Sequence, residues 1–271
     1  MIDSTLRPAS VTELTDWALS GRLGTDPGSV RAATAFRTTY GTRHTGRTTS
    51  YRNEILSIRI GAAVGSCALE PGTAADELVD ECVAARVAEL LAHPVPAVRI
   101  AALDAYLMHV RPHPYAGGVA GVPVTIDGPT SLAKSRRRAS LVVDLLPTGV
   151  RTVLVVGVVG SLLAELRARG IGYLPCDLAG GLTEWGEPVY DSVASVPADY
   201  DALLVTGMTL GNGSFDELRT GGLPTVLFAQ TGSAVLPWFL GAGVHAVSAE
   251  PYPFFSLDGG PSTIITYREQ S

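Results

Sequence analysis

The stretch Thr152-Val153-Leu154-Val155-Val156-Gly157-Val158-Val159-Gly160-Ser161 decides the fold class of this chain. Four of its first five residues are valine or leucine, and two glycines then lead into a segment with helical spacing, 161–169. A short, almost wholly apolar run is typical of a parallel strand that is buried on both faces. It is shorter than the roughly 20 apolar residues that a bilayer-spanning helix needs. The stretch therefore predicts a strand, a glycine turn and a helix, as in a Rossmann-like sheet.

The same alternation continues to the end of the chain. Short apolar runs predict further strands at 172–175, 202–205, 225–228 and 244–248, and an edge strand at 263–267. Helices are predicted at 130–146, 214–219 and 234–240. Apolar strands that alternate with helices form a parallel sheet with both faces covered. We therefore predict an α/β, Rossmann-like ligand-binding domain over residues 113–271.

Residues 1–112 show a different pattern, which predicts a small α+β domain. A helix is expected at 11–19, because Ser10 and Glu13 have the spacing of a capping box. Strands are expected at 32–40, 54–60 and 61–69, and helices at 74–91 and 97–110. The Pro/Gly-rich segment 111–127 reads as the connection between the domains.

The composition narrows the class of protein. The 271 residues carry a formal net charge of −6, whereas nucleic-acid-binding proteins usually present a basic field. The basic run 134–138 is typical of a solvated helix face, and an anion-binding or partner surface is the alternative. Cys67, Cys82 and Cys176 include no CxxC pair, and the N-terminal residues do not resemble a signal segment. We therefore expect a cytoplasmic protein with no disulfide framework, no membrane span and no nucleic-acid partner.

Two features predict a nucleoside site at the ends of the first two strands of the sheet. Gly157, Gly160 and Ser161 combine a tight turn with the free N–H groups of a helix N-terminus. Asp177 follows the second strand, at the place where Rossmann-like proteins hold ribose hydroxyls with a carboxylate. A plain tight turn and a turn-capping aspartate are the competing interpretations, because the full dinucleotide fingerprint is absent.

Two later strand ends extend the predicted site. Hydroxyl, thioether and amide side chains with glycines follow the strand at 202–205, and we assign to cofactor binding Thr206, Gly207, Met208, Thr209 and Asn212. The strand at 225–228 is followed by the candidate substrate-binding residues Gln230, Thr231 and Ser233. The alternatives are a glycine-rich turn in the first case and a helix N-cap at Ser233 in the second.

Candidate acid/base groups lie on the connection between the domains. His113 and Tyr115 are the predicted catalytic residues, although a histidine on a connection is more often simply exposed. The five histidines are scattered, and no His/Cys spacing predicts a metal site.

The segment Thr206-Gly207-Met208-Thr209-Leu210-Gly211-Asn212-Gly213 resembles the Thr-Gly-x-Thr-Leu-x-Asn-Gly signature of a family of unknown function that is labelled for heavy-metal chelation. Gly232-Ser233 and Gly243-Val244 also fit, whereas Asp104 stands where that family leads us to expect Asn. The resemblance implies an enolase-N-terminal-like α+β domain followed by a Rossmann-like domain. It also implies metal or metal-chelate binding, which no Cys/His cluster of this sequence supports.

The residues themselves favour an enzyme with an adenosyl cofactor, most of all S-adenosylmethionine. The expected chemistry is alkyl transfer or intramolecular cyclisation of the cofactor's aminoalkyl chain, because a sulfonium is already a good leaving group and positioning supplies much of the rest. A metal or metal-chelate binding protein is the alternative, and a nicotinamide enzyme is disfavoured by the incomplete glycine fingerprint. The expected partner is a small molecule, and a homodimer is one option for the assembly.

Overall fold

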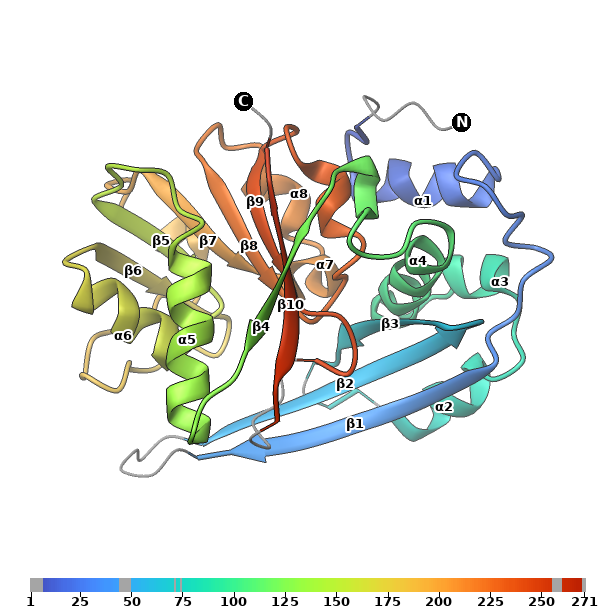
Figure 1. Ribbon diagram of the computed structural model, residues 1–271, viewed down its shortest axis with the longest axis horizontal. Coiled ribbons are helices and arrows are strands. Elements are labelled where there is room, and N and C mark those ends of the chain that lie inside the picture. The colour runs from blue at the N-terminus through green and yellow to red at the C-terminus, as the bar shows by residue number, and fades with distance from the viewer. Residues whose placement is uncertain (1–6, 44–49, 71, 74, 255–259, 270–271) are drawn as a thin grey trace.

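A computed structural model describes residues 7–43, 50–70, 72–73, 75–254 and 260–269. Its larger sheet has seven strands in the order β4-β10-β9-β8-β7-β5-β6 (Figure 1). The strands are β4 (Val122–Ile126), β5 (Thr152–Val156), β6 (Gly172–Cys176), β7 (Ala202–Thr206), β8 (Thr225–Ala229), β9 (Val244–Ala249) and β10 (Ser262–Arg268). Neighbouring strands from β6 to β9 are parallel, whereas β10 runs antiparallel to both β9 and β4. The predicted Rossmann-like α/β fold is confirmed.

Two helices cover one face of this sheet. They are α5 (Ser131–Val143) and α6 (Gly160–Ala168), which lie side by side in front of the strands in Figure 1. Val142 of α5 and Leu162 of α6 are fully buried in one cluster with Val153 and Val155 of β5. These two helices therefore cover one face of the apolar strand β5. The first part of the chain, residues 7–112, covers its other face.

The first part of the chain is built on a three-stranded antiparallel sheet of β1 (Thr34–Thr42), β2 (Tyr51–Ile60) and β3 (Ala63–Ala68). Four helices accompany it: α1 (Val11–Leu19), α2 (Ala75–Cys82), α3 (Val87–Leu91) and α4 (Pro96–Val110). Helix α4 packs against β3, and its side chains share one hydrophobic core with β5, β7, β8, β9 and β10 of the larger sheet. The expected division at 112/113 thus crosses a continuous core, and the assignment of 1–112 and 113–271 as two domains stays a prediction.

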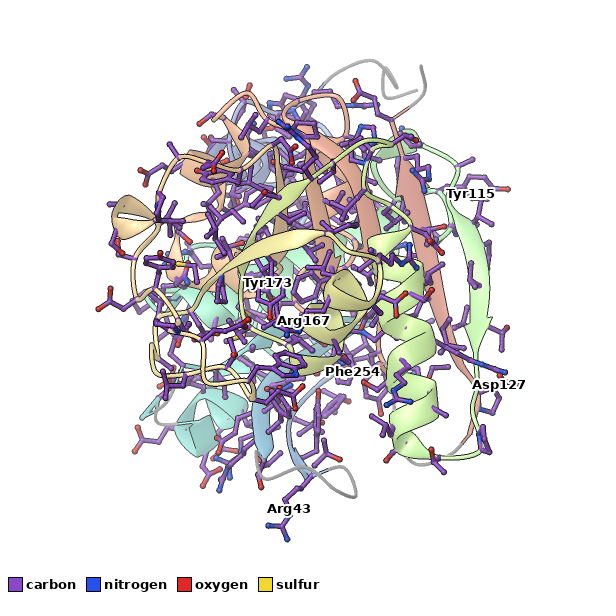
Figure 2. All side chains as sticks on the ribbon, turned by 90° about the vertical axis from the view of Figure 1, so that its left-hand side faces the viewer. Arg43, Tyr115, Asp127, Arg167, Tyr173 and Phe254 are labelled. Atoms are coloured by element: carbon purple, nitrogen blue, oxygen red, sulfur yellow. The ribbon has the colours of Figure 1, made fainter. Side chains whose placement is uncertain are left out.

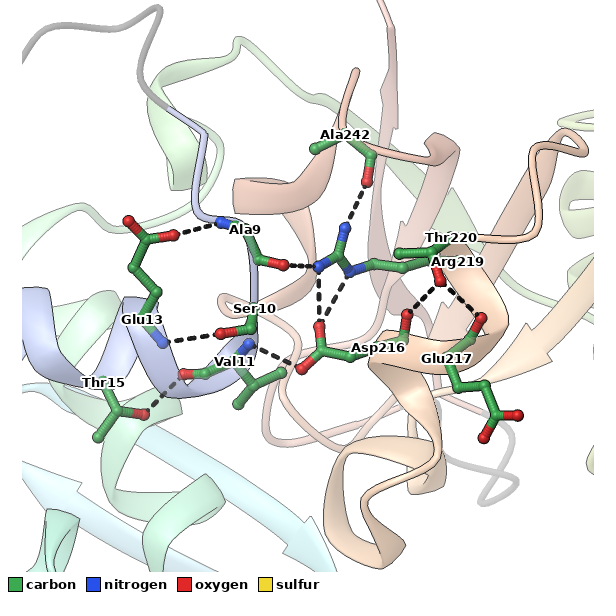
Figure 3. A network of polar contacts seen from close by, with 10 residues as sticks. All are labelled: Ala9, Ser10, Val11, Glu13, Thr15, Asp216, Glu217, Arg219, Thr220 and Ala242. Atoms are coloured by element: carbon green, nitrogen blue, oxygen red, sulfur yellow. Dashed lines mark hydrogen bonds and ion pairs between the residues drawn. The ribbon is translucent and has the colours of Figure 1, made fainter.

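Helix α1 is anchored to α8 (Phe215–Arg219) by a polar network (Figure 3). Ser10 is the N-cap, as expected, because Glu13 N donates to Ser10 Oγ at 3.0 Å, but the return bond of a capping box is shifted by one residue, since Glu13 Oε2 accepts from Ala9 N at 2.5 Å. Asp216, in α8 (Phe215–Arg219), accepts from Val11 N at 3.0 Å. The buried Arg219 donates to Asp216 and to the carbonyls of Ala9 and Ala242. One carboxylate and one guanidinium therefore join the first helix to the second half of the chain.

The expected helix at 74–91 is wrong in one respect, since two helices replace it. Ala84 has a φ of +63°, which no α-helix tolerates, and its N–H donates to Ala32 O. Ala32 N donates in turn to Ala85 O, so residues 84–86 pair with the strand-like segment before β1. A tertiary backbone pairing has thus overridden a continuous helical pattern. Residue 74 of the predicted helix is not among the described residues. The same holds for residues 1–6 and for residues 44–49 of the predicted polar loop between β1 and β2.

Three further expectations need correction. The region 234–240 holds only a 3-10 helix, η3 (Leu236–Phe239), because Pro237 has no N–H to donate and Ala234 N is bonded to Asp104. The segment 111–127 is no mere connection, since it contains η1 (Ala116–Gly118) and the edge strand β4. Strand β10 is therefore an inner strand and not the predicted edge. The weakly buried pattern of β4 explains why its pairing was missed.

Within the described ranges, no helix has the length and apolar character needed to span a bilayer. Cys67, Cys82 and Cys176 are buried and free, which agrees with the expected lack of a disulfide framework.

Candidate functional site

The topology places a ligand site where the strand order reverses. From β5 the chain passes outward to β6 and then returns across β5 to β7. Neighbouring connections leave opposite faces of the sheet at such a switch point, and a crevice opens at the carboxyl ends of the strands. A cavity of about 580 Å³ lies at this position, lined by the ends of β5, β6 and β7 and by α7 (Met208–Asn212), α8 and η2 (Val193–Ser195).

Gly157 and Asp177 both line this cavity, and a backbone hydrogen bond holds the Asp177 carboxylate next to the turn at Gly157. Gly157 has a φ of +89°, and a Cβ there would lie 2.4 Å from Thr206 Cγ2, so only glycine fits. Asp177 Oδ2 accepts from Val158 N at 3.0 Å, and Oδ1 accepts from Ala179 N at 3.0 Å. Each carboxylate oxygen keeps a further lone pair for a ligand. The backbone thereby fixes a carboxylate directly beside the glycine turn.

The third strand end also lines the cavity, and it does so as a helical turn. Residues 208–212 form α7, in which Thr209 Oγ1 donates to Thr206 O at 2.8 Å and Asn212 Oδ1 accepts from Ser214 N at 3.1 Å. Six of the nine predicted cofactor residues therefore meet in one cavity: Gly157, Asp177, Thr206, Met208, Thr209 and Asn212.

The charged side chains of the cavity wall are all acidic. Glu70, Asp191 and Glu217 join Asp177 there, and the described lining holds no lysine, arginine or histidine. Glu70 follows β3, Asp191 lies in the connection between β6 and β7, and Glu217 is in α8. These three residues were not predicted from the sequence, because no periodic pattern marks them. Cys176 also lines the cavity, and burial raises the pKa of its thiol, which is therefore neutral near pH 7.

The other three predicted cofactor residues do not line the cavity. Gly160 N, in the first turn of α6, donates to the Tyr51 hydroxyl of β2 at 2.8 Å. The Ser161 hydroxyl is buried and has no hydrogen-bond partner within the described part of the chain. Gly207 makes a close backbone approach, since a Cβ there would lie 2.5 Å from Thr231 O. In this structure the N-terminus of α6 thus contacts β2.

The predicted substrate-binding loop after β8 also contacts the first part of the chain. Tyr40 OH donates to Gln230 Oε1 at 2.8 Å, and Ala68 N donates to Thr231 Oγ1 at 2.9 Å. Ser233 is buried, with its hydroxyl 3.5 Å from His113 Nε2. None of the three lines the cavity. Their polar groups join β1 and β3 to the larger sheet, and substrate binding by them stays a prediction.

The predicted catalytic pair is separated from the cavity. His113 Nδ1 is hydrogen-bonded to the hydroxyl of Tyr267 in β10, and burial lowers the pKa of His113 to about 4. Burial also raises the pKa of Tyr267. Tyr115 is 64% exposed and points away from the body of the molecule (Figure 2). Neither residue lines the cavity, so this geometry adds no support for the catalytic assignment.

The buried imidazole predicts a pH-dependent stability. A histidine normally titrates near pH 6.5. Between about pH 6.5 and pH 4 the unfolded chain therefore binds a proton that native His113 does not, and the contribution of His113 to the free energy of unfolding falls with falling pH. We expect His113→Gln to remove this loss, as measured by urea unfolding from pH 4.5 to 8. Equal pH profiles for the variant and the wild type would contradict the assignment.

Metal binding gains no direct support from the side chains. The described ranges contain no group of three or more His, Cys, Asp or Glu side chains arranged to hold a metal ion. Metal or metal-chelate binding, which the resembled family implies, is therefore the alternative function.

Known proteins share the fold of this chain. No protein-family model matches the sequence, and no curated protein matches it either. A DUF364-family protein of unknown function from Desulfitobacterium hafniense DCB-2 has a similar structure, with a TM-score of 0.60 at 12% identity over 95% of this chain and 99% of that one. A second DUF364-family protein of unknown function, from Pyrococcus horikoshii, has a TM-score of 0.51 at 10% identity over 93% of this chain and 97% of that one. The chain therefore has the fold of DUF364-family proteins along almost its whole length.

Proposed function

We propose that the protein is an enzyme that binds an adenosyl cofactor, most of all S-adenosylmethionine, in the cavity at the ends of β5, β6 and β7. The observation that carries the proposal is the combination of a fixed carboxylate, Asp177, beside the turn at Gly157 with a wall whose charges are all negative. The carboxylate suits ribose hydroxyls, which are donors, and the glycine allows a close approach of the ligand. A cavity of about 580 Å³ is within the usual range for small-molecule sites.

The charge of the wall favours a sulfonium over a dinucleotide. The pyrophosphate of a nicotinamide cofactor is anionic and would face Glu70, Asp177, Asp191 and Glu217 without a lysine or arginine in the described lining. The N–H of Gly160, in the helix turn that normally receives a pyrophosphate, is bonded to Tyr51. The positive sulfur of S-adenosylmethionine is instead attracted by carboxylates in a partly enclosed site.

The chemistry proposed for this site is alkyl transfer, or displacement within the cofactor's own aminoalkyl chain. When bound, the cofactor supplies an activated carbon on a sulfonium leaving group. The residues of this chain hold and orient it: Asp177 at the ribose, the α7 turn along the cavity, and acidic side chains near the positive charge. An acidic wall also offers carboxylates that accept the proton released by an attacking amine.

Substitution of Asp177 tests the proposal. Asp177→Asn keeps the size of the side chain but removes its charge, and we expect S-adenosylmethionine to bind about 10- to 100-fold more weakly, since hydrogen bonds to charged groups contribute about 1.5–3 kcal/mol. Isothermal calorimetry measures the affinity, and thermal melts without ligand check that the fold is intact. Asp199→Asn is the matched control, because Asp199 is exposed and does not line the cavity.

Three ligands tested side by side separate the proposed function from its alternatives. Ligand at about 100 times its dissociation constant stabilises a protein by about 2.7 kcal/mol, which a melting curve detects. We expect S-adenosylmethionine to raise the melting temperature and NAD(H) to leave it unchanged. A rise with divalent metal ions alone would replace the proposal with the metal-binding function.

A further inference from the structure

A second cavity lies apart from the proposed cofactor site and shares no lining residue with it. It measures about 540 Å³ and is bounded by β1, the turn between β2 and β3, the end of α4 and the segment after β9. Its walls therefore come from both parts of the chain, and they include no residue of β5 or β6.

The apolar side of this cavity is formed by Phe36, Met108 and Tyr252. The rings of Phe36 and Tyr252 meet edge to face, with centroids 5.3 Å apart, and Tyr252 meets Phe254 in the same way at 5.4 Å. Such edge-to-face contacts restrain the rings, so that they present a firm surface to a flat apolar group. Tyr252 is nevertheless 43% exposed, which leaves its outer surface open to a ligand.

The polar side of the cavity carries cationic or ionisable nitrogen groups and no carboxylate among its described residues. Arg59 Nε donates to Gly61 O at 2.8 Å, which fixes the base of the guanidinium. No acidic side chain within the described ranges forms an ion pair with Arg59. His109 lies against the same turn, since a Cβ at Gly61 would be 3.4 Å from His109 Nδ1. This wall therefore carries positive charge although the chain has a net charge of −6, whereas the charged side chains of the proposed cofactor cavity are all acidic.

We propose that this second cavity binds a small organic carboxylate with a flat apolar body. We call the cavity the aryl-acid site, and its defining residues are Phe36, Arg59, Met108, His109 and Tyr252. The guanidinium of Arg59 accepts the carboxylate, since its planar fork of donors matches the two oxygens. His109 adds a second donor, and the body of the ligand lies against Phe36, Met108 and Tyr252. The site is independent of the proposed cofactor function.

The methionines allow the two cavities to be observed separately. The chain has three methionines, of which Met108 lines the aryl-acid site and Met208 lines the cofactor cavity. In protein labelled with ¹³C at the methionine methyl groups, we expect phenylacetate to shift the Met108 signal saturably and to leave Met208 unchanged. Met108→Leu assigns the signal. Phenylacetamide, which has the same body without the charge, should produce no saturable shift.

Substitution of the arginine completes the test. We expect Arg59→Gln to weaken phenylacetate binding at least tenfold. Arg52→Gln, which changes an exposed arginine of the same strand outside the cavity, should leave it unchanged. Equal binding of phenylacetate and phenylacetamide, a shift at Met208 in place of Met108, or an unchanged affinity in Arg59→Gln would each overturn the proposal.

Discussion

Replacement of Gly65 by alanine is expected to destabilise the protein by more than about 3 kcal/mol, beyond the usual 1–3 kcal/mol for an overpacked core. A Cβ at Gly65 would lie 1.9 Å from Ala105 N and 2.4 Å from Ala101 O. These are backbone atoms of α4, so no change of rotamer relieves the overlap. The helix must move away from β3, and it is the element that joins the small sheet to the common core.

Urea unfolding followed by far-ultraviolet circular dichroism measures this effect. Gly221→Ala is the matched control, because a Cβ there would have ordinary contact with Leu218 O at 3.6 Å. The double variant Gly65→Ala/Ala105→Gly should not recover stability, since removing the Ala105 side chain leaves the overlapping backbone in place. Unfolding midpoints for Gly65→Ala equal to those of the control would show that α4 does not approach β3 this closely.

The sheet could be predicted from the sequence because its signals are local. Four apolar residues in succession at 153–156 indicate burial on both faces wherever the partners lie, and β5 has the predicted bounds. Gly157 and Asp177 were found for the same reason, since the end of a parallel strand is itself a local feature. The helix break at Ala84 was not predictable in this way, because its cause is a backbone pairing with Ala32.

The acidic wall and the role of the loop after β8 depend on distant contacts. Glu70 and Glu217 come from separate parts of the chain and line one cavity because α7 packs on β3 and α4 and α8 packs on α7. Thr231 has the polar character of a ligand-binding residue, yet its hydroxyl accepts from Ala68 N, 163 residues away in the sequence. A sequence pattern shows that a polar group is available, but not whether a ligand or the protein's own backbone uses it.

Asp104 is the buried acid at the junction of the two parts, at the position where the resembled family leads us to expect asparagine. It is 1% exposed; Ser66 N donates to its Oδ2 at 2.8 Å and Ala234 N donates to its Oδ1 at 2.7 Å. Asparagine offers one oxygen, so Asp104→Asn sets an amide N–H₂ against one of these two donors. We expect a loss of about 1–3 kcal/mol at pH 8, the cost of leaving one buried donor unsatisfied.

The pH dependence of this variant distinguishes a lost acceptor from a general packing defect. Burial raises the pKa of Asp104 to about 7, although the hydrogen bonds from backbone N–H groups oppose the rise. Between about pH 4 and pH 7 the native protein holds a proton that the unfolded chain has lost, so Asp104 lowers the free energy of unfolding as the pH rises. His113 acts in the opposite direction between about pH 4 and 6.5, and the two contributions offset each other in the wild type.

Substitution of either Asp104 or His113 should therefore leave the pH dependence of stability that the other residue causes. In Asp104→Asn, urea unfolding should show stability that increases from pH 4.5 to 6.5, because only the His113 contribution remains. In His113→Gln, stability should instead decrease from pH 4.5 to 7, and the double variant should lack both slopes. A profile for Asp104→Asn parallel to that of the wild type would mean that this carboxylate titrates at its ordinary pKa, and that the backbone donors balance the effect of its burial at the junction.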